Sequence, residues 1–291
     1  MKKTRYVVIT PVRNEADYLG KTIDSMAMQT LLPVRWVIVD DGSRDRTAEI
    51  AELASELHPW ISLILRPDRG FRKSGGGVIE AFYDGYPLVE EIEWDYIVKL
   101  DGDLCFDPEY FEKCFACFDD DPKLGIGGGL IKVLERGELR IDASGDPPFH
   151  VRGATKIYRW ACWNQIKPLM KTPGWDTIDE VKANMYGWAT RTFSHLSLIQ
   201  LKATGHSDGC WRNWFKNGRA NYISGYHPLF MVAKCIRRVP KRPIVVASIA
   251  LLAGFCSGYI RRIPQTPDRN AISFLRRQQL RRLTFQPSIY S

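Results

Sequence analysis

Short apolar runs alternate with amphipathic stretches along the first part of this 291-residue chain. The apolar runs are rich in Val and Ile and short, which is typical of strands buried on both faces of a sheet. We expect strands at residues 6–10, 35–39, 60–65 and 95–100, and helices at residues 16–29, at 47–57, up to about 83 and from 108 on. This alternation predicts an α/β fold with a mostly parallel central sheet and helices on both of its faces.

Two acidic clusters follow two of these apolar runs. Asp40 and Asp41 come directly after one run, and Asp101 and Asp103 come directly after another. In open α/β sheets, ligands bind beyond the carboxyl ends of the strands. The pair Asp101 and Asp103 suits Mg²⁺ or Mn²⁺, because both ions prefer oxygen ligands. Asp40 and Asp41 can accept hydrogen bonds from a ribose or a nucleobase. The alternative for them is a helix N-cap, a role for which Ser43 competes.

A basic loop at residues 66–77 follows the third expected strand and contains the glycine-rich stretch 70–77. Its backbone amides and its cations, Lys73 among them, are suited to phosphate groups. The loop lacks the Gly-x-x-x-x-Gly-Lys-Ser/Thr order of a P-loop, and no Gly-x-Gly-x-x-Gly follows the first expected strand. The sequence therefore argues against a P-loop nucleoside triphosphatase and against a nicotinamide-dependent dehydrogenase.

A third acidic cluster lies further along the chain, at Trp175-Asp176-Thr177-Ile178-Asp179-Glu180. It comes at the start of a stretch with helical character that ends near Gly187. A carboxylate in this place can remove the proton of a sugar hydroxyl as a general base. The alternative is that the acids only complement the positive end of the helix dipole. The residues themselves leave both readings open.

The end of the chain differs from the rest in charge and hydropathy. The formal net charge is +8, yet twelve Lys and Arg residues against one Asp follow from Lys234 on, so the preceding part is mildly acidic. Residues 244–260 carry no charge and are flanked by basic pairs on both sides. We expect this segment to contact a membrane, because apolar helices with basic flanks bind anionic surfaces. The alternative is a buried helix of a soluble domain.

Taken in order, the motifs show a resemblance to a known enzyme family. They are Thr10-Pro11-Val12-Arg13-Asn14-Glu15, Val39-Asp40-Asp41-Gly42-Ser43, Asp101-Gly102-Asp103, and Gly174-Trp175-Asp176 with Gly187 downstream. This series resembles the family 2 inverting glycosyltransferases, which have a GT-A fold and use nucleotide-sugar donors. The resemblance covers roughly the first 210 residues. It implies a nucleotide-sugar site lined by Pro11, Arg13, Glu15, Asp40, Asp41, Lys73 and Asp101.

The same resemblance implies the metal ligands and the catalytic base. Asp101 and Asp103 would hold the sugar diphosphate and the metal ion, with His206 near the place of a further ligand in the family. The family's base is usually the Asp of a Glu-Asp pair eleven residues before a glycine. Counting back from Gly187 gives Asp176, but Trp175 stands where Glu is common. Asp179 therefore stays as the alternative base.

These observations lead to one set of expectations for the whole chain. We expect a GT-A domain at residues 1–232, with a nucleotide-binding half (1–104) and an acceptor half (105–232). A basic, membrane-associating segment would follow at residues 233–291, with an apolar helix at 244–260. The expected function is sugar transfer from a nucleotide donor to a lipid-linked or glycan acceptor. Seven cysteines without framework spacing favour reduced thiols, and hence the cytoplasmic side of the membrane.

Two other function classes remain open. A nucleotide-sugar pyrophosphorylase shares acids at strand ends, but it would carry a Gly-x-Gly-x-Arg loop after the first strand, where residues 11–15 read differently. A non-catalytic protein could bind nucleic acid through the arginines of the tail, with a steep dependence on salt. The apolar run between the basic pairs favours a membrane surface over nucleic acid as the partner.

Overall fold

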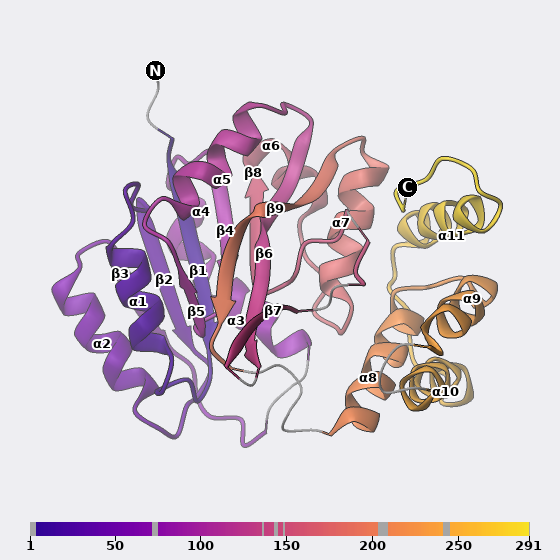
Figure 1. The fold of residues 1–291 in the computed structure, drawn as a ribbon. Helices are drawn as coiled ribbons and strands as arrows, with labels where there is room; N and C mark the ends of the chain where they lie inside the picture. Colours follow the sequence, from indigo (N-terminus) through magenta and orange to yellow (C-terminus); the bar gives the residue numbers. More distant parts are fainter. Residues whose placement is uncertain are drawn as a thin grey trace.

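The computed structural model describes residues 4–71, 75–135, 137–142, 145–147, 149–202, 209–240 and 245–290. Within these residues the strands form a single nine-stranded sheet in the order β3-β2-β1-β4-β8-β6-β9-β5, and β7 pairs with β6 (Figure 1). The strands are β1 (Tyr6–Val12), β2 (Arg35–Asp40), β3 (Ile61–Leu65), β4 (Tyr96–Leu100), β5 (Leu104–Phe106), β6 (Leu124–Glu135), β7 (Glu138–Ile141), β8 (Thr155–Arg159) and β9 (Ala189–Gln200).

Helices surround this sheet and also form a separate layer at the end of the chain. Those of the first part are α1 (Leu19–Ala27), α2 (Thr47–Leu57), α3 (Gly76–Gly85), α4 (Pro87–Glu90), α5 (Tyr110–Asp119), α6 (Trp160–Ile166) and α7 (Trp175–Met185). Those of the last part are α8 (Cys210–Ile223), α9 (Pro228–Arg238), α10 (Val246–Ile260) and α11 (Arg269–Leu283). The strands and helices expected in the first 120 residues are all present, with ends that differ by a few residues.

The first half of the sheet is parallel and is buried on both faces. β1 pairs in parallel with β2 and β4, and β2 pairs in parallel with β3. Alternate residues of β1 enter opposite cores: Val8 packs with the cluster under α1, α2 and α5, whereas Val7 packs with the cluster under α3, α6 and α7. This arrangement follows from the two-residue period of a strand. The predicted α/β class, with helices on both faces, is therefore confirmed.

The second half of the sheet is mixed. β8 runs antiparallel to both β4 and β6, β6 runs parallel to β9, and β5 runs antiparallel to β9. The glycine-rich part of β6 packs unusually closely against its surroundings. A Cβ atom added to Gly127 would lie 2.5 Å from the Phe193 ring, and one added to Gly128 would lie 2.4 Å from the carbonyl oxygen of Thr155. Glycine is needed here because any side chain would collide with these neighbours.

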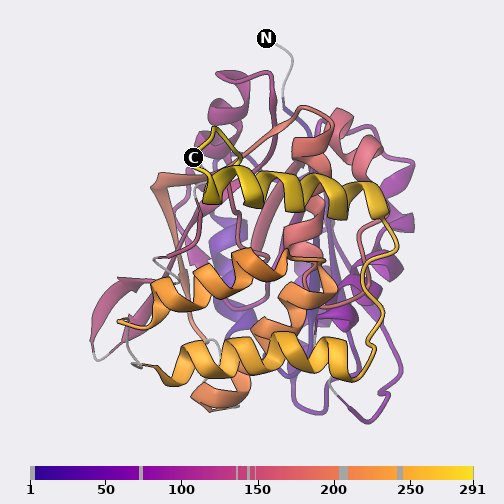
Figure 2. The ribbon, with the colours of Figure 1, turned by 90° about the vertical axis from the view of Figure 1, so that its right-hand side faces the viewer.

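The last four helices, α8 to α11, form their own layer beside α7, as Figure 2 shows from the right-hand side of Figure 1. α10 packs closely against α8, because a glycine on each helix lets the two backbones approach each other. A Cβ atom on Gly218 would lie 1.9 Å from the Leu251 carbonyl oxygen, and one on Gly254 would lie 2.0 Å from that of Phe215. A third apolar cluster fills the layer and includes Val181 of α7. One face of α10 is therefore buried in protein.

The layer begins earlier than the sequence suggests. The expected boundary at residues 232–233 falls inside α9, which spans Pro228–Arg238, and α9 packs with α8 and α10. The expected apolar helix at 244–260 corresponds to α10, Val246–Ile260, while residues 241–244 lie outside the described residues. In the part of the chain that the structure describes, no helix is both long enough and apolar enough to cross a bilayer.

Candidate functional site

The carboxyl ends of β1, β2 and β4 bring three of the predicted motifs to one rim of the sheet. The Asp41 amide donates to the Val12 carbonyl oxygen at 2.8 Å, and the Asn14 amide donates to Ser43 Oγ at 2.9 Å. A Cβ atom added to Gly102 would lie 2.6 Å from the Val12 side chain. The loops after the three strands therefore touch one another, as expected for parallel strands whose ends meet at one edge.

Asp40 and Asp41 have different surroundings at this rim, although both are buried. The Asp40 carboxylate closes its own turn, because the Ser43 amide donates to it at 3.1 Å and the Ser43 hydroxyl also bonds to it. The Asp41 carboxylate forms ion pairs with Arg66 and Arg69. Both arginines lie in the basic loop at residues 66–77, ahead of its glycine-rich stretch, and no sequence motif indicated them as site residues. Two guanidinium groups thus stand where a nucleotide site is predicted.

Arg13 binds the same loops together. Its guanidinium donates to the Asp41 carbonyl oxygen and pairs with Asp68 at 2.6 Å. The arginine hydrogen bonds and the Gly70 amide hold the pKa of the Asp68 carboxyl well below its usual range. Pro11, which the resemblance also placed here, lies in β1 opposite Val39.

Among the described residues, Asp103 is the buried acid with the fewest hydrogen-bond partners. It is 5% exposed, and Gln200 Nε2 donates to its Oδ2 at 3.1 Å. Its Oδ1 is buried and has no hydrogen-bond partner among the described residues. Burial and then the neighbouring Asp101 carboxylate raise the pKa of Asp103 to about 7. A buried carboxylate oxygen without a donor is the arrangement that a cation would complete, so the site fits a divalent metal ion.

Asp101 and Glu15 lie beside Asp103 and each has a lysine partner. Lys99, which is buried in β4, pairs with the Asp101 carboxylate. Lys202, which follows β9, reaches Glu15 Oε1 at 2.8 Å. The sequence analysis did not single out either lysine. The two lysines place positive charge beside these acids, and a bound diphosphate group would need such nearby cations.

Asp176 lies in the first turn of α7 and reaches the same rim. α7 follows Gly174, whose φ of +89° gives the chain the sharp bend before the helix. A Cβ atom added to Gly153 would lie 3.5 Å from the Cβ atom of Asp176. The Gly153 carbonyl oxygen in turn accepts a 2.6 Å hydrogen bond from the Lys99 ammonium group that pairs with Asp101. Contacts through Gly153 and Lys99 therefore link Asp176 to Asp101.

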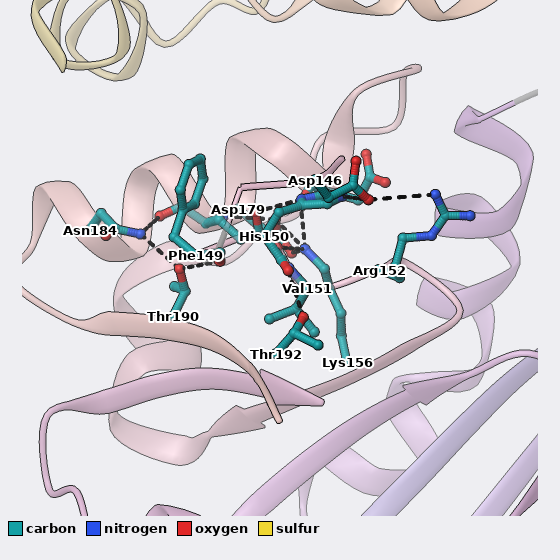
Figure 3. Close-up of polar contacts among 12 residues, drawn as sticks. Asp146, Phe149, His150, Val151, Arg152, Lys156, Asp179, Asn184, Thr190 and Thr192 are labelled. Atoms are coloured by element: carbon teal, nitrogen blue, oxygen red, sulfur yellow. Dashed lines mark hydrogen bonds and ion pairs between the residues drawn. The ribbon is translucent and has the colours of Figure 1, made fainter. Parts of the chain in front are cut away.

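Asp179, the alternative base, lies in a buried charge network beneath α7 (Figure 3). Asp179 is 2% exposed, and its oxygens accept hydrogen bonds from Lys156 at 2.8 and 2.9 Å and from the Tyr158 hydroxyl at 2.6 Å. Lys156 also contacts Glu180 Oε1 at 2.9 Å and the Asp176 carbonyl oxygen at 2.5 Å. The lysine therefore contacts the first two turns of α7, and an acceptor hydroxyl has no exposed face of Asp179 to approach.

His150 completes this buried network. Its Nδ1 lies 2.9 Å from Glu180 Oε2, and the Val151 amide donates to the other Glu180 oxygen at 2.7 Å. Burial lowers the pKa of His150, but the Glu180 carboxylate, helped by Asp176 and Asp146, outweighs it and raises the pKa to about 8. His150 is thus charged in neutral solution, and together with Lys156 it balances the buried carboxylates.

Two of the predicted site residues, Lys73 and His206, lie outside the described residues. The end of the glycine-rich loop is described at Gly75, where φ is +73°. A Cβ atom there would lie 2.7 Å from the Cα atom of Pro173. The loop therefore ends against the residue that precedes Gly174, next to the start of the helix that carries Asp176.

Comparison with known proteins identifies the family of this chain. The sequence profile described as "Glycosyl transferase family 2" matches residues 7–165, which is more than half of the chain. The chain belongs to glycosyl transferase family 2. The matched range includes the rim loops with Asp41, Asp101 and Asp103, and ends before Asp176. The family predicted from the order of the motifs is thereby confirmed, and the pyrophosphorylase and nucleic-acid-binding alternatives are not favoured.

Curated relatives of this family 2 member include two polysaccharide synthases. Chondroitin synthase of Pasteurella multocida is 27% identical over 117 residues, which are 40% of this chain and 11% of that protein. Poly-beta-1,6-N-acetyl-D-glucosamine synthase of Staphylococcus aureus is 25% identical over 126 residues, which are 43% of this chain and 28% of that protein. The aligned part thus spans less than a third of the length of either relative.

Solved structures show the fold over almost the whole chain. The mannosyltransferase PcManGT from Pyrobaculum calidifontis, in complex with GDP-Man and Mn²⁺, has a TM-score of 0.57 at 15% identity and covers 97% of this chain and 81% of that one. TarS of S. aureus has a TM-score of 0.54 at 17% identity and covers 92% and 44%. At these identities the likeness concerns the fold alone, and it confirms the predicted GT-A architecture.

Proposed function

We propose that this chain is an inverting glycosyltransferase that moves a sugar from a nucleoside-diphosphate donor to an acceptor hydroxyl. The observation that carries the proposal is the connection of Asp176 to Asp101 through Gly153 and Lys99. It puts a candidate base beside the acids that would hold the donor diphosphate. The nucleoside would lie over the rim loops near Asp41, with Asp40, Pro11, Arg13 and Glu15 shaping the floor, as the family resemblance implies.

The proposed donor site includes a divalent cation, Mg²⁺ or Mn²⁺, held by Asp103 with Asp101. The unpartnered Oδ1 of Asp103 supports this placement. Within the described ranges, no three His, Cys, Asp or Glu side chains gather to hold a metal ion. Two carboxylates leave coordination positions for diphosphate oxygens and water, as is usual for Mg²⁺ sites. When bound, the cation would offset the charge that develops on the leaving nucleoside diphosphate.

In the proposed reaction, Asp176 accepts the proton of the acceptor hydroxyl as that oxygen attacks the anomeric carbon. A single displacement inverts the configuration and needs one base, without a covalent carboxylate intermediate. Asp176 suits this role better than Asp179, because Asp179 is buried and already accepts hydrogen bonds from Lys156 and Tyr158. Lys156 would hold the backbone of Asp176 in place.

We further propose a lipid-linked or polysaccharide acceptor at the inner leaflet of a membrane, with the site on the cytoplasmic side. The names of the two synthases support a role in glycan assembly. The concentration of Arg and Lys after residue 233 supports an anionic surface as the partner, because basic segments are attracted to anionic lipids. The seven free cysteines are in keeping with a reducing compartment.

The decisive experiment replaces the proposed base. A screen of nucleotide sugars with Mn²⁺ or Mg²⁺ first identifies the donor from its slow hydrolysis. Asp176→Asn should then reduce the transfer rate constant kcat by about 10²- to 10⁴-fold, the usual contribution of a general base. The affinity for the nucleoside diphosphate, measured by calorimetry, should persist. Transfer at the parent rate would show that Asp176 is not the base.

The matched control is Asp24→Asn, an exposed acid on α1 that should leave both measurements unchanged. Asp103→Ala should have the complementary effect and lose metal-dependent nucleotide binding. Unchanged calorimetric titration of that variant with nucleoside diphosphate and Mn²⁺ would refute its role as a ligand of the cation.

A further inference from the structure

α9 and α10 leave apolar side chains uncovered on the outer face of the C-terminal layer. Leu229 and Ile236 on α9 are 63% and 66% exposed, and Ile249 and Ile260 on α10 are 53% and 81% exposed. Val232, Val246 and Tyr259 lie exposed on the same two helices. Figure 2 shows α9, α10 and α11 side by side across this face, and α9 packs against both of the others. The exposed apolar groups of α9 and α10 therefore lie on neighbouring helices of this layer.

A basic groove runs along α11 on this layer. It has a volume of about 750 Å³, and its lining includes His227 and four arginines, Arg269, Arg276, Arg277 and Arg281. The lining residues, all within the described ranges, include no carboxylate. Two hydroxyls, those of Ser273 and Thr284, also line it. Arginine side chains with hydroxyl donors form the typical environment for a phosphate group.

The groove and the apolar surface are adjacent. His227 lines the groove and directly precedes α9, where its Nδ1 accepts a hydrogen bond from the Leu229 amide at 3.2 Å. Near the C-terminal end of α11, Phe285 follows the lining residue Thr284 and is 96% exposed. A phosphate ligand in the groove would therefore lie near exposed apolar side chains, those of α9 and that of Phe285.

We propose that the face formed by α9, α10 and α11 docks on an anionic membrane, with the groove of α11 holding the phosphate of a phospholipid headgroup. Phe285 and the exposed side chains of α9 and α10 enter the acyl region. The inference deepens the proposed membrane association and rests on it. It assigns that association to one groove and one surface of the fold, and it does not depend on the sugar-transfer chemistry.

Charge and hydropathy together favour this occupant over two others. A second copy of the chain would bring two arginine-lined grooves toward each other across a twofold interface, and like charges repel. Nucleic acid would use the arginines but would leave the apolar side chains of α9 and α10 in water. A phospholipid surface can bind both the arginine-lined groove and the apolar side chains of α9 and α10, because it presents phosphate groups above acyl chains.

The test is sedimentation of the full chain with vesicles of phosphatidylcholine, alone or mixed with phosphatidylglycerol. Parent protein should bind the mixed vesicles and bind neutral ones weakly, and salt should weaken the binding. The charge reversal Arg277→Glu/Arg281→Glu should weaken it by at least about 30-fold, since each basic residue near an anionic surface contributes about fivefold. Arg276 is left intact because it donates to the Gly225 carbonyl oxygen within the fold.

The matched control is Arg46→Glu/Lys113→Glu, which makes the same change in net charge on exposed side chains of the loop before α2 and of α5. It should bind like the parent. A separate pair, Ile236→Ser/Ile249→Ser, should weaken binding through lost apolar contact, and the residual binding should be more sensitive to salt. Thermal melting of every variant checks that it is folded.

Each remaining outcome has a distinct meaning. If the parent binds and the Arg277→Glu/Arg281→Glu variant binds equally well, the groove is not the headgroup site, although the membrane association stands. If the parent binds neither kind of vesicle, both proposals fail, while sugar transfer to a soluble acceptor stays testable. Release from vesicles by millimolar inorganic phosphate at constant ionic strength would make the groove a site for soluble phosphate. A dimer in light scattering that the charge reversal dissociates would make it a subunit interface.

Discussion

Asp103 and Asp179 are both almost fully buried acids, yet their surroundings differ. Asp179 accepts hydrogen bonds from Lys156 and Tyr158, and Lys156 also contacts the neighbouring Glu180. Asp103 accepts one hydrogen bond from Gln200, and its other oxygen has no partner among the described residues. The protein supplies hydrogen-bond donors to both oxygens of the Asp179 carboxylate. The Asp103 carboxylate has a donor for one oxygen only among the described residues, and it lies next to the Asp101 carboxylate.

The difference separates a structural network from a binding site. A buried charge is tolerated when it is paired and hydrogen-bonded, and it then fixes the packing of the elements that carry it. A buried carboxylate oxygen without a donor raises the free energy of the folded state unless a ligand supplies the missing interaction. By this criterion Asp179 holds α7 in place and Asp103 is the candidate ligand for a cation, although both come from acidic clusters in the sequence.

The largest expected effect concerns the network under α7. Lys156→Met should lower the free energy of unfolding by about 3–5 kcal/mol, because it leaves the buried Asp179 carboxylate without its cation and leaves Glu180 to pair with His150. Denaturant unfolding measures the change. Lys113→Met, which breaks an exposed ion pair with Glu109, should change stability by less than about 1 kcal/mol. Equal effects at the two sites would remove the distinction between the network and an ordinary surface pair.

The sequence predicted the rim of the sheet well and the network poorly. Apolar runs followed by acids located Asp41, Asp101 and Asp103, because parallel strands place their ends at one edge. The spacing to Gly187 pointed to Asp176, but it left Asp179 as an alternative. The partner that distinguishes them, Lys156, lies in β8, twenty or more residues earlier in the chain. Such a pairing is set by the packing of α7 on the sheet and leaves no local pattern.

Glycine contacts explain why other parts of the fold were missed. The glycine-rich stretch of β6 lacks the β-branched pattern of a strand, because Gly127 and Gly128 must let Phe193 and the Thr155 carbonyl oxygen approach closely. α10 was predicted as an apolar helix from its composition. That one of its faces packs on α8 depends on the close contact of Gly254 with Phe215, which sequence hydropathy does not reveal.

A smaller effect is expected at the rim when a divalent ion is added. Mn²⁺ or Mg²⁺ should stabilise the parent by about 2.7 kcal/mol at a concentration a hundred times its Kd, because it binds only the folded state. Asp103→Asn should lose this gain, whereas Lys156→Met should retain it despite its lower baseline. Thermal melting with and without EDTA measures the difference. If the metal ion stabilised Asp103→Asn as much as the parent, the Asp103 carboxylate would not be a ligand of the cation.

The smallest effect tests the charge of His150 within the network. Its pKa of about 8 lies above the usual 6.5, so the folded state binds this proton more tightly than the unfolded state does. The stabilisation is therefore fully present below about pH 6.5 and is lost as pH rises through about 8, and it amounts to about 2 kcal/mol. His150→Gln should remove this part of the pH dependence, measured as the difference in unfolding free energy between the variant and the parent.

That difference cancels groups that titrate equally in both proteins, Asp103 among them, and leaves the titration of His150 together with its coupling to Asp179, whose pKa burial raises to about 7. A parent that loses no stability relative to His150→Gln between pH 6 and 9 would mean that His150 is neutral next to Glu180. Lys156 would then be the only cation facing the two carboxylates, and its replacement should be more damaging than the 3–5 kcal/mol typical of a broken buried pair. The pH profile of one variant thus fixes how the charge is divided in the network that positions Asp176.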